Sequence, residues 1–154
     1  MTSRIGIMQG RLSKPLNGRI QSFPINTWEK EFYLAKEIGF ELIEWVLDDN
    51  IKDNPILNKS TFKKISQIKQ ETQIEINSIC CDFFMSNSLS KNSISFREKN
   101  LEILNYLIEE SCPSNNIKII DLPLVGSESL KRKGTYDDYK NLLLKLEKKI
   151  MENN

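Results

Sequence analysis

The sequence predicts an α/β protein built on a parallel sheet, and two observations support this fold class. Four apolar runs rich in β-forming residues each precede a segment whose apolar residues recur with helical spacing. Because tight turns cannot join parallel neighbours, helices between consecutive strands indicate a parallel sheet with right-handed crossovers. The pattern alone favours an open doubly wound sheet over a barrel, since an eight-unit barrel takes about 250 residues and this chain has 154.

The four expected strands lie at residues 5–8, 42–47, 74–81 and 117–122. In the second strand Ile43, Trp45 and Leu47 share one apolar face, which we expect to lie under the helices. Trp45 is therefore interpreted as a core residue rather than as a platform that stacks on a sugar ring. We expect a polar set to point to the opposite side of the sheet, and it consists of Gln9, Glu44, Asp82 and Asp121.

The first two helical segments are defined by apolar stripes and by signals at their ends. Asn26 and Glu29 have the spacing of a capping box, and Gly39 is a stop signal. The second segment begins near Ser60. The residues expected on the apolar stripes are Trp28, Phe32, Ala35 and Ile38 in the first segment and Phe62, Ile65 and Ile68 in the second.

The last two helical segments show the same signals. Ser95 with Glu98 opens the third segment, and Pro113 is expected to end it. Thr135 and Asp138 are expected to cap the fourth. The apolar positions are Leu101, Leu104, Leu107 and Ile108 in the third segment, and those expected to face inward in the fourth are Tyr139, Leu142, Leu143, Leu146 and Ile150.

The composition excludes several classes of function. With 22 basic and 21 acidic residues the net charge is +1, which argues against nucleic acid and against an anionic membrane as partners. The chain has no histidine, so the commonest general base and the commonest transition-metal ligand are both missing. Three cysteines, two of them adjacent, do not form a disulfide framework, and we expect them to be reduced. Without a signal-peptide pattern or a membrane-length apolar run, the expected location is cytoplasmic.

Several segments together resemble a known family. The stretches IGIMQGRLS and GRIQSFP, the W-x-x-E-F pattern at residues 28–32 and GFELIEWVLD at residues 39–48 resemble the amino-terminal signature of sugar phosphate isomerase/epimerase proteins. CCDFFM at residues 80–85 and IDLPLVGSESL at residues 120–130 are similar to the third- and fourth-strand segments of that family. The family belongs to the xylose isomerase-like TIM barrel superfamily. The resemblance therefore implies a parallel (βα)4 half of a TIM barrel, spanning residues 1–154 as one partial domain.

The resemblance also implies a chemistry. Members of the superfamily use a divalent metal, often Mn²⁺, Mg²⁺, Co²⁺ or Zn²⁺, to polarise a hydroxy-ketone while carboxylates move a proton at the adjacent carbon. Their metal ligands and acid/base residues come from strands in the carboxyl half of the barrel. For this chain alone we therefore predict no metal site and assign no catalytic residue. The residues expected to line the substrate, a small carbohydrate or phosphosugar, are Gln9, Arg11, Glu44 and Asp82.

These candidate residues have a structural alternative. Gln9, Glu44 and Asp82 lie near the carboxyl ends of expected strands, where parallel α/β proteins place ligands. An isolated buried charge is costly, so the carboxylates could instead pair with guanidinium groups and hold loops in place. The guanidinium groups available for such pairs are those of Arg4, Arg11 and Arg19.

Two hypotheses about the whole chain remain at this point. The first is the amino-terminal half of an isomerase/epimerase barrel, from a truncated gene, a split gene or a partial product, which pairs with a separate carboxyl-half chain. The second is a non-catalytic half-barrel that self-associates, for example as a homodimer, because four units leave the first and fourth strands as unpaired edges.

Overall fold

The computed structural model describes residues 3–15, 18, 21–89, 94–125, 129, 131 and 135–152. Its centre is a four-stranded sheet in the order β1-β2-β3-β4, and every neighbouring pair is parallel. The strands are β1 (Gly6–Met8), β2 (Leu42–Val46), β3 (Glu75–Cys80) and β4 (Ile119–Asp121). The predicted α/β class and the parallel sheet are confirmed. The sequential strand order is consistent with half of a barrel, and the described sheet lacks the order reversal of a doubly wound fold.

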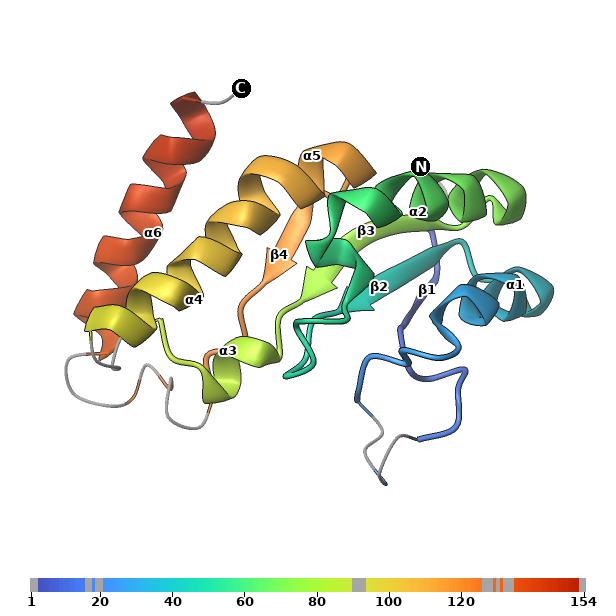
Figure 1. The fold of residues 1–154 in the computed structure, drawn as a ribbon, viewed down its shortest axis with the longest axis horizontal. Helices are drawn as coiled ribbons and strands as arrows, with labels where there is room; N and C mark the ends of the chain where they lie inside the picture. Colours follow the sequence, from blue (N-terminus) through green and yellow to red (C-terminus); the bar gives the residue numbers. More distant parts are fainter. Residues whose placement is uncertain are drawn as a thin grey trace.

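Helices connect consecutive strands, and Figure 1 shows them stacked along the sheet from α1 at one end to α6 at the other. α1 (Trp28–Ile38) and α2 (Lys59–Thr72) follow β1 and β2, with a short 3-10 helix at Pro55–Leu57 before α2. After β3 come α3 (Phe83–Ser86), which the sequence did not predict, and α4 (Ile94–Tyr106). A π-helical turn (Leu107–Ser111) and α5 (Cys112–Asn115) lead to β4, which α6 (Thr135–Glu152) follows.

The main core lies between the sheet and these helices, and Trp45 is its centre. Trp45 is fully buried, with its ring 5.3 Å from that of Phe23 and 5.5 Å from that of Trp28. Its indole Nε1 donates to Asn54 Oδ1 at 2.9 Å, so the one polar atom of the ring has a partner. Ile43 lies on the same face and is also buried. The predicted core role of Trp45 and the predicted orientation of its strand are confirmed.

The ends of α1 differ in part from the prediction. Gly39 has a φ of 95°, a left-handed conformation that glycine adopts without strain, and its N–H bonds to the carbonyls of Ala35 and Lys36. The predicted stop is therefore confirmed. The capping box of Asn26 and Glu29 is wrong, because the helix is preceded by Thr27 and no side chain caps it. Ile38, the last residue of α1, is 59% exposed, so the apolar stripe of this helix is not buried along its whole length.

The third helical segment continues past the residue that was expected to end it. Pro113 lies in the first turn of α5, where its missing N–H and its fixed φ cost little. The segment ends instead at Asn116, which has a left-handed φ of 58°. At its start α4 begins with Ile94, within one residue of the expected opening at Ser95.

α6 buries fewer of its apolar side chains than the sequence predicted. Tyr139 and Leu146 are 2% and 9% exposed, which confirms their inward orientation. Leu143 and Ile150 are 48% and 42% exposed, so the prediction for these two residues is wrong. Helical periodicity shows that a helix has an apolar face, but the width of that face covered by a neighbour depends on the packing. Thr135, one of the two expected cap residues, is the first residue of α6, and the residues before it, 132–134, lie outside the described residues.

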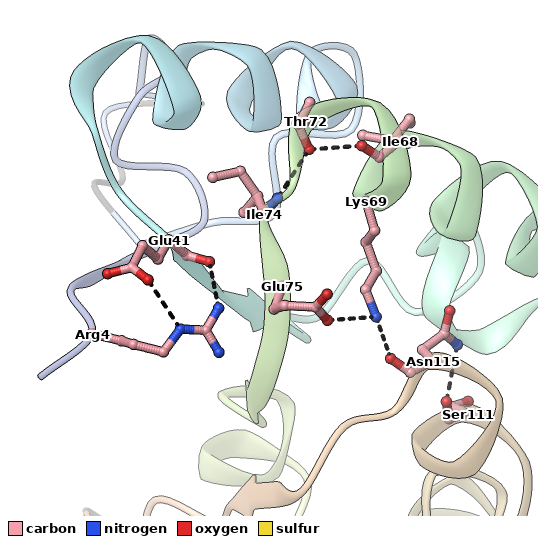
Figure 2. Close-up of polar contacts among 9 residues, drawn as sticks. All are labelled: Arg4, Glu41, Ile68, Lys69, Thr72, Ile74, Glu75, Ser111 and Asn115. Carbon is pink, nitrogen blue, oxygen red and sulfur yellow. Dashed lines mark hydrogen bonds and ion pairs between the residues drawn. The ribbon is translucent and has the colours of Figure 1, made fainter. Parts of the chain in front are cut away.

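Polar contacts tie the chain together at the amino-terminal ends of the strands, as Figure 2 shows. Lys69 of α2 forms a 3.2 Å ion pair with Glu75 at the start of β3 and donates to the Asn115 carbonyl at 2.7 Å. Arg4 and Glu41 form a second, more exposed ion pair at 3.3 Å. These contacts join α2, β3 and α5 at this end of the sheet. The side chains of these two ion pairs therefore have structural roles at this end of the sheet.

Candidate functional site

The loop after β1 is held over the carboxyl ends of the strands by a buried carboxylate. Glu31 of α1 is 1% exposed, and its two oxygens accept from the backbone N–H groups of Gly10 at 2.8 Å and Leu12 at 3.1 Å. Burial raises the pKa of this carboxyl, and the hydrogen bonds from the loop oppose that shift. Gly10 has a φ of 87°, and a Cβ at this position would lie 2.5 Å from the Ser22 carbonyl oxygen. The loop is therefore packed closely against itself and against α1.

A second carboxylate fixes the return of the same loop. Asp48, two residues after the end of β2, accepts from the backbone N–H groups of Phe23 at 2.8 Å and Asn50 at 3.1 Å. Phe23 is buried against Trp45, so this part of the loop is joined to the core. The hydrogen bonds of Asp48 and Glu31 are structural, and they position the side chains that lie between them in the loop.

One polar chain links the loop to β3. Gln21 Nε2 donates to Asp82 Oδ2 at 2.6 Å, and Gln21 Oε1 accepts from Arg11 at 3.4 Å. Cys80 lies against the other carboxylate oxygen, with its Sγ 3.4 Å from Asp82 Oδ1. The structure thus brings two predicted residues, Arg11 and Asp82, to one place through Gln21. The sequence analysis missed Gln21, although it lies inside the GRIQSFP segment that was singled out.

Glu44 forms the second part of the site. Strand register pairs Glu44 with Ser78, and Ser78 Oγ donates to Glu44 Oε1 at 2.9 Å. Glu44 is partly exposed, while its neighbour Trp45 is buried, as alternation predicted. Asp121 pairs in register with Cys80 and is exposed. The face of the sheet away from the helices therefore presents carboxylates from β2, β4 and the end of β3.

Gln9 lies apart from this set. The register of β1 pairs Met8, rather than Gln9, with Glu44. Gln9 is 1% exposed, its N–H donates to the Glu44 carbonyl, and its Oε1 accepts from Val46 N–H at 3.2 Å. The side chain thereby extends the ladder between β1 and β2 beyond the last residue of β1. Its Nε2 is buried and has no acceptor among the described residues.

The cysteines are buried thiols among these carboxylates. Burial raises the pKa of Cys80, and the nearby charges of Asp82, Asp121 and Glu44 raise it further. Burial likewise raises the pKa of Cys81, and it raises that of Cys112 to about 11. A thiol with a raised pKa is a poor nucleophile at neutral pH. The cysteines therefore serve as packing residues, in line with the sequence analysis.

The site lacks a metal-binding arrangement among the residues that the structure describes. In the described part of the chain no three cysteine or carboxylate side chains are arranged to hold a metal ion. Arg19, a predicted alternative partner for the carboxylates, lies outside the described residues. The chemistry that the described site supports is hydrogen bonding through Glu44, Ser78, Gln21 and Asp82, with one guanidinium group at its border.

No protein-family model and no curated protein sequence matches the chain. The candidate site is therefore defined by its geometry. Among the residues that the structure describes, no helix has the length and apolar character needed to cross a membrane.

Proposed function

We propose that this chain is the amino-terminal half of a metal-dependent sugar or sugar-phosphate isomerase/epimerase barrel. In this proposal it supplies part of the substrate-binding surface, while the metal, Mn²⁺, Mg²⁺, Co²⁺ or Zn²⁺, is bound by the carboxyl half of that barrel. The observation that carries the proposal is a polar row on the sheet face away from the helices, made of Glu44, Ser78, Gln21 and Asp82. Glu44 and Ser78 lie midway along β2 and β3, and Asp82 with Gln21 lies just beyond the carboxyl end of β3, the end of the strands at which barrel enzymes bind substrate. The resemblance of the sequence segments supports the same family.

Each group of the row has a role in this proposal. Ser78 occupies Oε1 of Glu44, and no described residue donates to Oε2, which is free to accept from a sugar hydroxyl. Gln21 and Cys80 orient the carboxylate of Asp82, which accepts from a second hydroxyl. The Arg11 side chain is exposed, and among the described residues its guanidinium group is hydrogen-bonded only to Gln21, so it can pair with a phosphate. These contacts bind and orient a polyhydroxylated ligand, and no proton transfer is assigned to them.

Binding of sugar phosphates to the purified chain tests the proposal. Titration with a panel of ketose and aldose phosphates, followed by NMR, should shift the side-chain amide signals of Gln21. Asp82→Asn and Glu44→Gln should weaken binding about 10-fold or more, since each removes a charged acceptor. Glu41→Gln is the matched control, because Glu41 is an exposed carboxylate at the opposite end of the strands. Equal affinity of all four proteins would refute the assigned surface.

Activity and metal content test the division between halves. The chain alone should show no isomerase or epimerase turnover and no stoichiometric metal, whereas a carboxyl-half chain should restore both on mixing. One tightly bound metal equivalent per purified chain would show that the amino half carries its own metal site and would overturn this part of the proposal.

A further inference from the structure

The Gln21 side chain lies between two opposite charges, the guanidinium group of Arg11 and the carboxylate of Asp82. Its Nε2 donates to Asp82 Oδ2 at 2.6 Å, and its Oε1 accepts from Arg11 at 3.4 Å. Because a carboxylate only accepts and a guanidinium group only donates, these partners fix which end of the amide faces which charge. Within the described residues, Arg11 and Asp82 meet only through this amide.

The backbone brings Arg11 and Gln21 side by side and holds both. Gly10 and Ser22 are in close contact, since a Cβ at Gly10 would lie 2.5 Å from the Ser22 carbonyl oxygen. Arg11 follows the first of these residues, and Gln21 precedes the second. Glu31 accepts from the N–H groups of the residues before and after Arg11. The contact between Arg11 and Gln21 can therefore change by side-chain rotation while the backbone stays in place.

The two hydrogen bonds of Gln21 differ in strength. The bond to Asp82 is short and has a charged acceptor, which makes it the stronger of the two. The bond from Arg11, at 3.4 Å, is long for an N–H···O contact, and the guanidinium group is exposed. The amide should therefore stay on Asp82 when the guanidinium group turns toward another partner.

Without this amide the two charges would pair with each other. Hydrogen bonds between a guanidinium group and a carboxylate are about twice as strong as those between neutral groups. A single amide group separates Arg11 from Asp82, and the arginine side chain can rotate about several bonds to cross that gap. Direct pairing would occupy the guanidinium group and the carboxylate that the proposed function gives to a ligand.

We propose that Gln21 is a spacer that keeps Arg11 and Asp82 from pairing, so that both charges remain available to one ligand. A carboxylate oxygen accepts about two hydrogen bonds, and Gln21 uses one of them at Asp82 Oδ2. The other can come from a sugar hydroxyl, while the guanidinium group turns to an anionic group of the same ligand. Gln21 is thus a positioning residue. The use of the two charges rests on the proposed function, whereas their separation by Gln21 does not.

Chemical labelling of arginine tests the separation in the ligand-free chain. Phenylglyoxal reacts with guanidinium groups, and mass spectrometry of the digested protein gives the rate at each arginine. Gln21→Ala should slow the labelling of Arg11 by up to about fivefold, the factor that an exposed ion pair with Asp82 would contribute. Gln21→Ala/Asp82→Asn should restore the wild-type rate. Arg4, in its ion pair with Glu41, is the internal reference, because none of these substitutions touches it.

A second variant and a matched control accompany this test. Gln21→Glu keeps the size of the side chain but replaces the donor that faces Asp82 with an acceptor. Its added charge attracts the guanidinium group, so labelling of Arg11 should slow here as well. Gln67→Ala is the control, because Gln67 also donates from Nε2 to a carboxylate, Glu71 Oε1 at 2.7 Å, on the exposed side of α2. It should leave the labelling of Arg11 unchanged, and circular dichroism should show every variant folded.

Binding of inorganic phosphate, followed by NMR, gives a second readout. This probe needs the guanidinium group but no hydroxyl acceptor, so Gln21→Ala should weaken its binding by up to about fivefold. Asp82→Asn should strengthen phosphate binding more in the Gln21→Ala background than in the wild type, because only there does it also release Arg11. A merely structural role of Gln21 would give Asp82→Asn the same gain in both backgrounds.

Unchanged labelling of Arg11 in both Gln21 variants would overturn the proposal. Slow labelling that Asp82→Asn does not relieve, or equally slow labelling in Gln67→Ala, would also overturn it. Failure of the proposed function has a different signature, since the wild-type chain would then bind no sugar phosphate. The labelling rates would still decide the role of Gln21 in that case.

Discussion

Replacement of Glu31 by alanine tests whether a buried carboxylate holds the loop that carries Arg11 and Gln21. The wild-type side chain is 1% exposed and accepts from the N–H groups of Gly10 and Leu12. A buried donor left without a partner costs about 1–3 kcal/mol. Because Gly10 and Leu12 are only half-buried and water can reach them in part, we expect the two losses to total about 2–4 kcal/mol.

Urea unfolding followed by the fluorescence of the buried tryptophans, Trp28 and Trp45, measures this cost. With a urea dependence of about 1–3 kcal/mol per M, the midpoint of Glu31→Ala should fall by about 1–2 M. Glu29→Ala is the matched control, since Glu29 lies on the same helix in an exposed ion pair with Lys64. Exposed pairs contribute about 0–1 kcal/mol. Equal destabilisation by the two substitutions would refute the structural role of Glu31.

The contribution of Glu31 to the free energy of unfolding should depend on pH with a definite sign. Burial raises the pKa of Glu31 in the folded state above the value of 4.5 that applies to the unfolded chain. The folded state then binds more protons between these two pKa values, so the contribution of Glu31 to stability is largest below pH 4.5 and falls as pH rises through the folded pKa. The difference in unfolding free energy between wild type and Glu31→Gln should therefore shrink from pH 4 to pH 8. A difference that grows with pH would show that the hydrogen bonds from the loop outweigh burial.

The remaining predictions concern the loop, the core and the thiols. Gly10→Ala should destabilise the fold by about 1–3 kcal/mol, more than Gly18→Ala, because both have a positive φ but only Gly10 meets a backbone oxygen; equal melting temperatures would contradict this. Asn54→Ala should cost about 2–4 kcal/mol in urea unfolding, since the buried amide accepts from the indole N–H of Trp45 and donates to the Val46 carbonyl; a loss below about 1 kcal/mol would argue against that role. Cys112, whose pKa burial raises to about 11, should react with a thiol reagent only as the chain unfolds, and rapid labelling of the native protein would show that the thiol is accessible.

Local signals predicted the elements well and their ends less well. Four parallel strands and the αL stop at Gly39 follow from apolar spacing and from glycine, which act over a few residues. Pro113 was expected to end the third helical segment. It lies instead in the first turn of α5, which directly follows the π-helical turn and tolerates a proline. The four-residue helix α3 was missed, since a single turn has no periodicity to detect.

Alternation along strands predicted only part of the candidate site. It placed Glu44 on the face opposite Trp45, because the two-residue period of a strand is a local property. It could not place Gln9, which follows the end of β1 and turns its side chain into the ladder with β2. Gln21 and Ser78 could not be assigned from spacing, since their roles depend on partners in other elements.

The sequence by itself determined the fold class, the parallel direction of the strands and the burial of Trp45, because short-range periodicity dictates which side chains must leave water. Only the tertiary structure decided which polar groups meet, since Gln21 and Asp82 are 61 residues apart and join when the loop after β1 packs over β3. It also decided which apolar side chains remain exposed. Leu143 and Ile38 fit their helical stripes, but a stripe is buried only where a neighbouring element covers it, and none of the described elements does so at the two ends of this sheet.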